Sequence, residues 1–314
     1  MKVVWKISKY LLLAVLILLA FIVISFGHSD IPLEELKAKY AEGSSFIDVN
    51  GMEVHYRDEG LASDSLPLVL IHGTGSSLHT FDVWAQELSR QHRVIRLDMP
   101  AFGLTGPFPN RDYSIAHYVD FLHAFLSELN VDKCILGGNS LGGCIAWNYC
   151  IEHPQQVEKL ILIDASGYPN KEASTPLAFT LARMPVVNKL ICYVTPSFIA
   201  RKSVENVYAD KSKLTDDVAQ RYFELTLRKG NRQAFVDRMN TEMDTSTIKS
   251  IKSIQQNTLI LWGEEDRLIP LKSAYRFAKD LPKDTLVVLP GSGHVPMEEN
   301  PLESLDAVFS FLNK

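Results

Sequence analysis

The sequence predicts an α/β fold, in which a mostly parallel β-sheet is covered by helices on both faces. Short, continuous apolar runs recur along the chain, as expected of strands that are buried on both faces. Longer segments with helical periodicity lie between them, and strands that alternate with helices are typical of a parallel sheet. The chain has 314 residues, 46% of them apolar, so it can bury a sizeable core without disulfides or metals.

The strands are predicted from two kinds of signal. Ser45–Val49 and Met52–Tyr56 flank Asn50-Gly51, which is the dipeptide most typical of a tight β-hairpin. The other strands are apolar runs of suitable length. They are Leu68–Ile71, Arg93–Leu97, Lys133–Leu136, Leu160–Ile163, Thr258–Trp262 and Thr285–Leu289.

Helices are predicted between these strands, at Ile115–Leu129, Leu141–Glu152, Leu271–Asp280 and Leu302–Leu312. The alternation breaks over residues 168–253, where several prolines precede amphipathic stretches at Asp216–Leu227 and Gln233–Met239. We interpret residues 168–253 as an all-helical insertion. The core is then formed by residues 45–167 and 254–314.

The N-terminal segment predicts a membrane anchor. Residues 10–26 read YLLLAVLILLAFIVISF without a charge, and three lysines precede them. A helix of this length just spans the hydrocarbon core of a bilayer, and the basic flank favours a cytoplasmic N-terminus. We therefore expect a single-pass anchor over residues 1–27 in the cytoplasmic membrane. A tether follows over residues 28–44, and the remaining domain lies outside the cytoplasm.

A cleaved signal peptide is the alternative to this anchor. Gly27 and Ser29 are small residues at positions suited to signal peptidase, so cleavage near Ser29 would release a soluble, exported protein. The apolar stretch is longer than is usual for a signal peptide, which favours the anchor.

Composition excludes some classes of partner. Lys and Arg number 32 against 37 Asp and Glu, and no basic run is present, so nucleic acid is not an expected partner. The four cysteines lack the spacing of a zinc site or a disulfide framework and are interpreted as small buried hydrophobic residues; they are Cys134, Cys144, Cys150 and Cys192. No metal or cofactor is implied.

A glycine-rich turn contains the predicted nucleophile. The strand Lys133–Leu136 runs into GGNSLGG and then a helix, so Gly138, Ser140 and Gly142 form the G-x-S-x-G of a nucleophile elbow. The serine of such an elbow sits on a sharp turn, and the flanking glycines let strand and helix approach each other. Ser140 is the predicted nucleophile. The backbone N–H of Leu141, at the start of the helix, is a predicted donor to the oxyanion.

The second oxyanion donor is predicted in the loop His72-Gly73-Thr74-Gly75, which follows the strand Leu68–Ile71. A tetrahedral intermediate needs at least two donors, and the backbone N–H of Thr74 is the natural second one. We expect His72 to support this loop rather than to act as a base, because it precedes the serine in the chain.

An acidic residue and a histidine follow the last two strands. GEEDRLIP comes after Thr258–Trp262, and PGSGH comes after Thr285–Leu289, which completes the chain order of serine, acid and histidine. His294 is the predicted base, and the acid would fix its tautomer and stabilise the imidazolium. Spacing alone does not choose among Asp266, Glu264 and Glu265. Asp164, at the end of the strand Leu160–Ile163, is a further alternative.

These motifs resemble those of the α/β-hydrolase fold family over residues 45–314. HGTG, DMPAFG, GNSLGG, GEEDRLIP and GSGHVPMEENP occur in family order. The resemblance implies an eight-stranded, mostly parallel sheet with one antiparallel strand, and a helical cap at residues 168–253. It places the acid at Asp266. Gly73, Gly138, Asn139 and Gly142 would shape the loops around Ser140.

The residues of the elbow exclude some of the activities known for this fold. Dehalogenases and epoxide hydrolases of this fold carry aspartate where this chain has Ser140. Asn139 is similar to the residue found in enzymes that hydrolyse carbon–carbon bonds of meta-cleavage products, but those enzymes have tryptophan where this chain has Val295, and they are usually cytoplasmic.

We therefore expect a serine hydrolase that cleaves a small-molecule carboxylic ester, or a related acyl substrate, through an acyl-enzyme. A carbon–carbon bond hydrolase and a non-catalytic ligand-binding hydrolase fold are the alternatives. The second of these is disfavoured because all three triad residues are present.

Overall fold

The computed structural model describes residues 2–169, 174–242 and 244–314, apart from the side chains of residues 2–4, 6–7, 12, 15–16 and 18–20. Within these ranges eight strands form one sheet, in the order β1-β2-β4-β3-β5-β6-β7-β8. The strands are β1 Ser45–Val49, β2 Met52–Gly60, β3 Leu68–Ile71, β4 Arg93–Leu97, β5 Cys134–Asn139, β6 Val157–Ile163, β7 Asn257–Gly263 and β8 Asp284–Leu289. Only β2 runs antiparallel to its neighbours, so the predicted eight-stranded, mostly parallel sheet is confirmed.

The hairpin turn is determined by local backbone preference, whereas the length of strand β5 is determined by its neighbours in the sheet. Asn50 and Gly51 have φ angles of 54° and 81°, as a mirror-image turn requires, and the hairpin closes with Val49 opposite Met52. Strand β5 extends three residues beyond the predicted Leu136, because β3 and β6 pair with it on both sides. Sheet pairing there outweighs the low strand propensity of glycine.

Two cores cover the sheet, one on each face. Alternate residues of β3 divide between them: Val69 and Ile71 pack with one cluster, and Leu68 and Leu70 with the other. The first core contains α4 Ile115–Glu128, α5 Leu141–Glu152 and α11 Lys272–Asp280. The second contains α3 Asp82–Leu88 and α13 Pro301–Leu312. Helices therefore lie on both faces of the sheet, as predicted.

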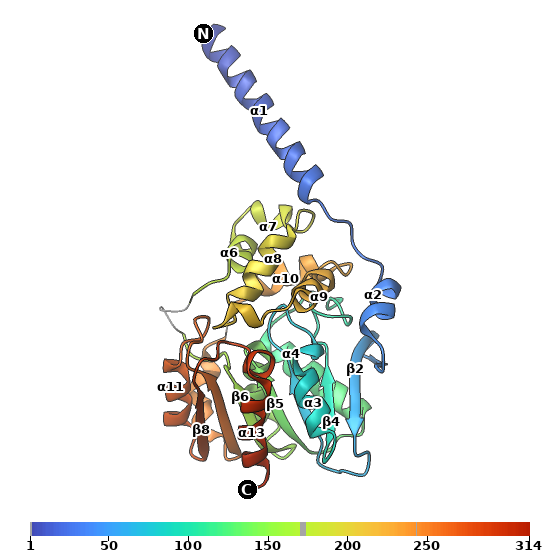
Figure 1. Ribbon diagram of the computed structural model, residues 1–314, viewed down its shortest axis with the longest axis vertical. Coiled ribbons are helices and arrows are strands. Elements are labelled where there is room, and N and C mark those ends of the chain that lie inside the picture. The colour runs from blue at the N-terminus through green and yellow to red at the C-terminus, as the bar shows by residue number, and fades with distance from the viewer. Residues whose placement is uncertain (1, 170–173, 243) are drawn as a thin grey trace.

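A group of helices inserted between β6 and β7 covers one end of the sheet. They are α6 Leu177–Arg183, α7 Val187–Leu190, α8 Ser197–Glu205, α9 Asp216–Thr226 and α10 Asn231–Asn240. Figure 1 shows them in yellow and orange, above the ends of the strands. After these helices, the 3-10 helix Ser246–Ser253 packs on α5 and buries Ile251 in the first core.

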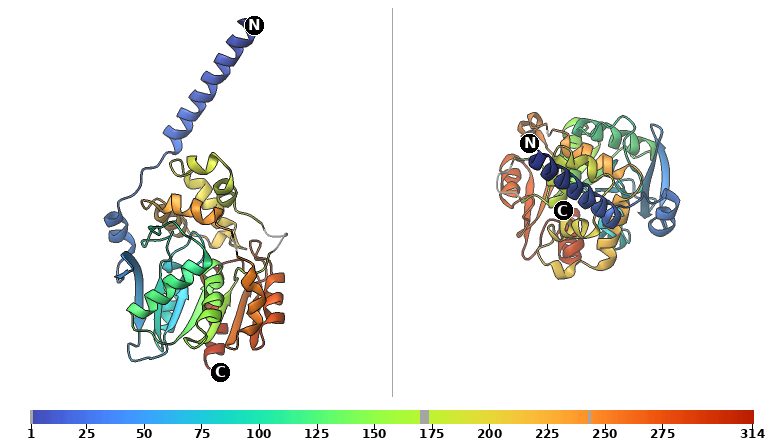
Figure 2. Two further views of the ribbon diagram at one scale, coloured as in Figure 1. Left: turned by 180° about the vertical axis from the view of Figure 1, so that it is seen from behind. Right: turned by 90° about the horizontal axis from the view of Figure 1, so that it is seen from above.

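The chain begins with helix α1, Lys2–Phe26, which projects away from the sheet on the far side of the inserted helices (Figures 1 and 2). Helix α2, Leu33–Tyr40, lies back on the domain and buries Leu36 against Leu104 and Leu225. Across the residues that the structure describes, no helix is long and apolar enough to cross a membrane. The anchor at residues 10–26 stays a prediction.

Candidate active site

Ser140 occupies a sharp turn between β5 and α5. Its backbone has φ 56° and ψ −114°, a conformation that non-glycine residues rarely adopt and that is held here by neighbouring backbone. The Ser140 N–H donates to the carbonyl of Ile163 at 3.0 Å. A Cβ atom at Gly138 would lie 2.3 Å from the carbonyl group of Gly142, so the close crossing of strand and helix requires glycine.

His294 and Asp266 form a buried pair next to this turn. His294 follows β8, Asp266 follows β7, and their Nδ1 and Oδ2 atoms are 2.7 Å apart. The other oxygen of Asp266 accepts the N–H groups of Leu268 and Ile269, at 2.8 and 3.0 Å. These two bonds and the histidine hold the carboxylate in one orientation.

The three acidic residues after β7 differ in exposure. Glu264 and Glu265 point to solvent, whereas Asp266 is only 5% exposed and contacts His294. The remaining ring nitrogen of His294, Nε2, is buried and makes no hydrogen bond. Because Ser140 and His294 line the same cavity, this nitrogen is available to accept a proton from the serine.

The loop after β3 lies directly against the nucleophile. A Cβ atom at Gly73 would be 2.9 Å from the Cβ of Ser140, so only glycine permits this approach. Thr74 lines the cavity, and Leu141 is the first residue of α5, where its N–H has no partner within the helix. The two predicted oxyanion donors therefore flank Ser140 from different elements.

His72 stabilises this loop from beneath. Its Nδ1 donates to the carbonyl of Gly73 at 2.7 Å, and its Nε2 accepts the N–H of Met99 at 2.9 Å. Burial lowers the pKa of His72, which keeps the ring neutral and suited to both bonds. Both ring nitrogens of His72 are therefore engaged by backbone groups.

Asn139 connects the elbow to the histidine loop. Its side-chain amide donates to the carbonyl of His294 at 2.9 Å and to that of Ile163 at 3.2 Å. Asn139 thus helps to hold the backbone of His294 in position. His294 is also held from the inserted helices, because its N–H donates to the carbonyl of Val207 at 2.7 Å.

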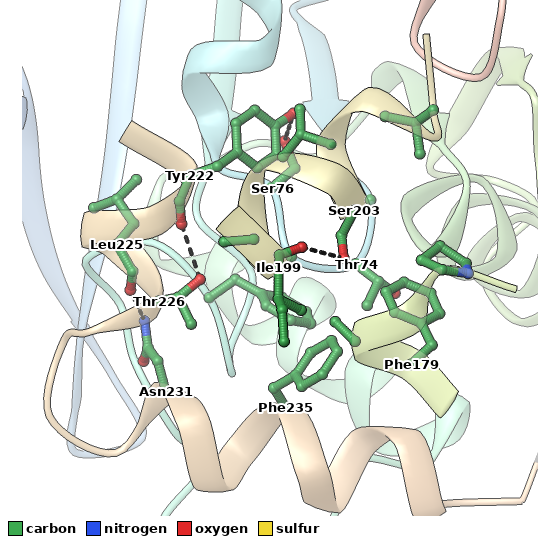
Figure 3. A pocket seen from close by; sticks show the side chains of 18 of the residues that line it. Thr74, Ser76, Phe179, Ile199, Ser203, Tyr222, Leu225, Thr226, Asn231 and Phe235 are labelled. Atoms are coloured by element: carbon green, nitrogen blue, oxygen red, sulfur yellow. Dashed lines mark hydrogen bonds between the residues drawn. The ribbon is translucent and has the colours of Figure 1, made fainter. Parts of the chain in front are cut away.

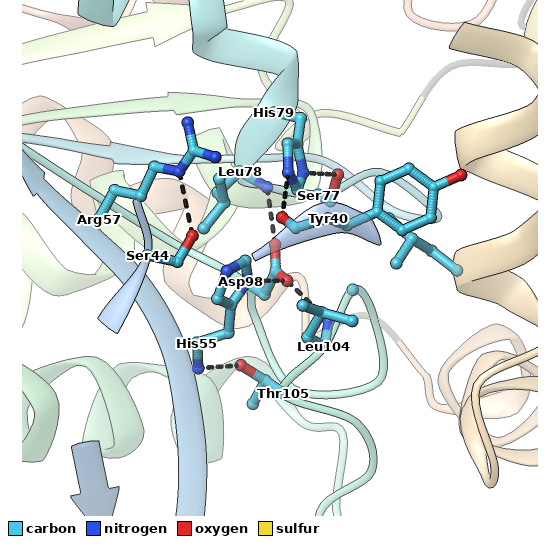
Figure 4. Close-up of polar contacts among 12 residues, drawn as sticks. Tyr40, Ser44, His55, Arg57, Ser77, Leu78, His79, Asp98, Leu104 and Thr105 are labelled. Atoms are coloured by element: carbon cyan, nitrogen blue, oxygen red, sulfur yellow. Dashed lines mark hydrogen bonds and ion pairs between the residues drawn. The ribbon is translucent and has the colours of Figure 1, made fainter. Parts of the chain in front are cut away.

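A second buried acid–histidine pair was not predicted. His55 Nδ1 lies 2.6 Å from Asp98 Oδ2, and Asp98 also accepts the N–H groups of Leu78 and Leu104, each at 2.7 Å (Figure 4). Burial alone would raise the pKa of Asp98, but the charge of His55 and its hydrogen bond outweigh burial, and the pKa is lowered. Sequence motifs gave no sign of this pair, because His55 comes from β2 and Asp98 follows β4.

The cavity above Ser140 has a volume of about 170 Å³ and is mainly apolar. The inserted helices contribute Phe179, Ile199, Val204, Leu225 and Phe235, several of which appear in Figure 3. A polar corner is formed where the hydroxyl of Tyr222 meets Ser76 Oγ at 3.1 Å and the carboxylate of Glu298 at 3.2 Å.

Arg232 is the only Lys or Arg among the residues described as lining this cavity, and its charge is already engaged. Its guanidinium donates to the Asp30 carboxylate at 2.7 Å and to the carbonyl of His28 at 2.9 Å. No Asp or Glu belongs to the same lining. Within the part of the lining that the structure describes, the wall is thus mainly apolar and its one cation is engaged.

We assign no metal ion to this site. Asp266 and His294 are occupied with each other, and the arrangement of serine, histidine and aspartate supplies a nucleophile and a base without one.

The fold and this arrangement of residues define a hydrolase of the α/β type. The chain belongs to the alpha/beta hydrolase fold family, whose sequence profile matches residues 67–301. Comparison with individual proteins adds detail to this classification.

A relative from Pseudomonas putida, 2-hydroxy-6-oxo-2,4-heptadienoate hydrolase, is 29% identical over 270 residues, covering 83% of this chain and 93% of that protein. The structure of a meta-cleavage product hydrolase from Pseudomonas fluorescens matches with a TM-score of 0.76 and 25% identity, covering 87% of this chain and 98% of that one. A membrane phospholipase A matches with a TM-score of 0.74 and 24% identity, covering 100% and 98% of the two chains, which shows the shared fold.

Proposed function

We propose that this protein is a serine hydrolase that cleaves carboxylic esters with an apolar acyl group. The observation that carries the proposal is the mainly apolar cavity, which is lined by Ser140 and His294 and whose one Arg is engaged by Asp30. The pairing of His294 with Asp266 at 2.7 Å supports the role of His294 as the base.

In the first half of the proposed reaction, Ser140 Oγ attacks the ester carbonyl carbon while His294 Nε2 takes the serine proton. Asp266 accepts the Nδ1–H of the histidine and stabilises the imidazolium. The negative oxygen of the tetrahedral intermediate accepts the N–H groups of Thr74 and Leu141. As the carbon–oxygen bond breaks, His294 returns the proton to the departing alcohol.

In the second half, water hydrolyses the acyl-enzyme. His294 removes a proton from the water, whose oxygen attacks the acyl carbon, and the same two N–H groups hold the second oxyanion. Collapse of this intermediate releases the carboxylic acid, and His294 returns the proton to Ser140 Oγ. Bonds and protons balance without a cofactor.

Hydrolysis of a carbon–carbon bond is the second candidate function. The 29% identical relative is named for a dienoate substrate, and Asn139 favours this reading as well. A dienoate carries a carboxylate, and burial of that charge needs a cation or several donors. Arg232 is engaged by Asp30 and by the carbonyl of His28, and the described lining contains no other Lys or Arg, which supports a neutral ester over an anionic substrate.

A substrate panel distinguishes the two functions. We expect kcat/KM for p-nitrophenyl esters to rise from acetate towards longer acyl chains, with little turnover of a 2-hydroxy-6-oxo-dienoate. Ser140→Ala should remove turnover of every ester, and wild type should react with a fluorophosphonate. Faster turnover of the dienoate than of any ester would support the second candidate. A wild-type protein inert to both substrates and to fluorophosphonate would support a non-catalytic role.

We further propose that residues 10–26 anchor the protein in the cytoplasmic membrane, with its catalytic domain outside the cytoplasm. The uncharged run and the preceding lysines support this location. The end of α1 is held on the inserted helices, since the rings of Phe26 and Phe198 are 5.8 Å apart. Tyr193 and Phe198, which contact this end of the chain, expose 72% and 52% of their surface, as apolar residues beside a membrane would.

This location can be tested by fractionation. We expect full-length chain in the carbonate-resistant pellet, and digestion of the domain by protease added outside the cytoplasmic membrane. A soluble product that begins at Asp30 would contradict the anchor but would remain consistent with export. A domain protected on the cytoplasmic side would contradict both.

A further inference from the structure

Asp164 is a buried carboxyl group that the proposed reaction does not use. It follows β6 with a φ of 44°, is fully buried, and accepts the N–H of Gly263 through Oδ1 at 2.9 Å. Its second oxygen, Oδ2, is buried and has no hydrogen-bond partner. An orphaned polar atom of this kind is costly, so its surroundings require an explanation.

The surroundings of Asp164 are acidic. Three atoms lie within 4.8 Å of one another: a carboxylate oxygen of Asp164, a carboxylate oxygen of Asp266 and a ring nitrogen of His294. Glu299 also acts on Asp164 electrostatically, and its own carboxylate accepts the N–H groups of Gly293 and Asp210, each at 2.6 Å. His294 can carry a positive charge, and its ring is bonded to Asp266.

Two buried carboxyl groups this close do not both ionise. Asp266 has the larger number of hydrogen-bond donors, because Leu268, Ile269 and His294 donate to it. Asp164 receives only the N–H of Gly263. Burial first, and then the charge of Asp266, raise the pKa of Asp164 well above its ordinary value.

We propose that Asp164 keeps its proton at neutral pH and donates it through Oδ2 to the carboxylate of Asp266. This inference rests on the proposed function, in which Asp266 orients His294. Asp164 is then a positioning residue. The retained proton gives Asp164 Oδ2 a hydrogen-bond partner and gives Asp266 a further donor. It also leaves a single negative charge beside the imidazolium.

Asparagine is a close mimic of the protonated acid at this position. In Asp164→Asn, the amide oxygen can accept the N–H of Gly263 and the amide nitrogen can donate to Asp266, as we propose for Asp164. Asparagine also tolerates a positive φ. Asp164→Gly suits the same backbone but removes the donor, so the two variants separate hydrogen bonding from backbone strain.

The first experiment measures thermal unfolding of full-length protein and needs no activity. A group whose pKa is raised on folding stabilises the fold below its unfolded pKa, and this contribution is lost as pH rises towards the folded value. Because asparagine does not ionise, Asp164→Asn does not lose this stability as pH rises. The Tm of Asp164→Asn should therefore exceed that of wild type by a margin that widens between pH 5 and 8, by about 2 °C per pH unit.

A lower Tm for Asp164→Asn, by a margin that does not shrink as pH rises, would mean that Asp164 is ionised in the folded protein, and would overturn the proposal. This result does not depend on ester hydrolysis, so failure of the proposed function would be recognised separately by an inert wild type.

The second experiment measures the pH profile of ester hydrolysis. Asp164→Asn should keep kcat within about threefold of wild type, with an unchanged acidic limb of kcat/KM. Asp164→Gly should lower kcat by about 10-fold, as expected for a lost hydrogen bond to a charged group. Its acidic limb should also move to higher pH, because an Asp266 without this donor stabilises the imidazolium more strongly. An unchanged kcat and limb in Asp164→Gly would refute the positioning role.

Discussion

Two acid–histidine pairs are buried in this protein, and only one of them lies beside a nucleophile. His294 and Asp266 are 2.7 Å apart, and His55 and Asp98 are 2.6 Å apart. In each pair the acid accepts two backbone N–H groups as well as the histidine. By distance and burial alone the two pairs are equivalent.

The difference lies in what the second ring nitrogen faces. His294 lines the cavity that contains Ser140, whereas His55 is fully buried, stacks on Phe46 with ring centroids 5.1 Å apart, and does not line that cavity. Asp98 instead fastens the loops that begin near Leu78 and Leu104. In this protein, an acid–histidine pair can therefore serve to hold buried loops. Such a pair can take part in catalysis only where a hydroxyl group and a cavity lie beside it.

The largest effect is expected for the residue that distinguishes the two pairs. Ser140→Ala should lower kcat by about 10⁶-fold while leaving the fold intact, because the nucleophile is lost. The exposed Ser127→Ala in α4 is the matched control, and should leave both turnover and Tm unchanged. Ester hydrolysis and circular dichroism measure the two properties. A rate for Ser140→Ala above a tenth of the wild-type rate would remove Ser140 from the mechanism.

A matched change in the two acids tests the comparison itself. Asp266→Asn should lower kcat by about 10⁴-fold, because the histidine is then held in the wrong tautomer. Asp98→Asn should lower kcat by less than about 10-fold. It should instead reduce the free energy of unfolding by about 2–3 kcal/mol, because a buried charged hydrogen bond is lost. Kinetics and denaturant unfolding of both variants check these outcomes, and exchanged phenotypes would reverse the assignment of the pairs.

The smallest expected effect concerns acid stability. The pKa of Asp98 is lowered in the folded protein, so its contribution is present above the unfolded value of about 4 and is lost as pH falls through the folded pKa. Wild type should therefore lose stability more steeply than Asp98→Asn below about pH 4. Unfolding midpoints across this range measure the slopes. Parallel slopes would show that Asp98 carries no special charge stabilisation.

The local parts of the fold could be predicted because local forces decide them. Leu68–Ile71 is a short apolar run of the kind that favours a buried strand, and Asn50-Gly51 determines its turn by its own backbone preference. The order of the strands in the sheet is a tertiary property. The family resemblance implied eight strands with one antiparallel strand, but not the order in which they pair.

In the site too, local motifs predict some residues, whereas others come together only through tertiary structure. Ser140 and His294 were identified from motifs next to strands, but the choice of Asp266 over its acidic neighbours came from the family pattern and agrees with its burial. The contact of His55 with Asp98 depends on β2 lying beside β4, and that of Asp164 with Asp266 on β6 lying beside β7. The cap side chains that form the cavity could not be assigned, because several helices supply them and no motif does.

The bond between Arg232 and Asp30 has a practical consequence for enzyme preparation. Arg232 lines the cavity, but its counter-ion comes from the segment that leads away from α1. A protein that begins at residue 31 would lose both Asp30 and the carbonyl of His28, leaving the guanidinium in the cavity wall without its carboxylate counter-ion. Truncation for solubility would thus change the selectivity of the protein towards acidic compounds, and substrate profiles measured on such a fragment would describe a different cavity.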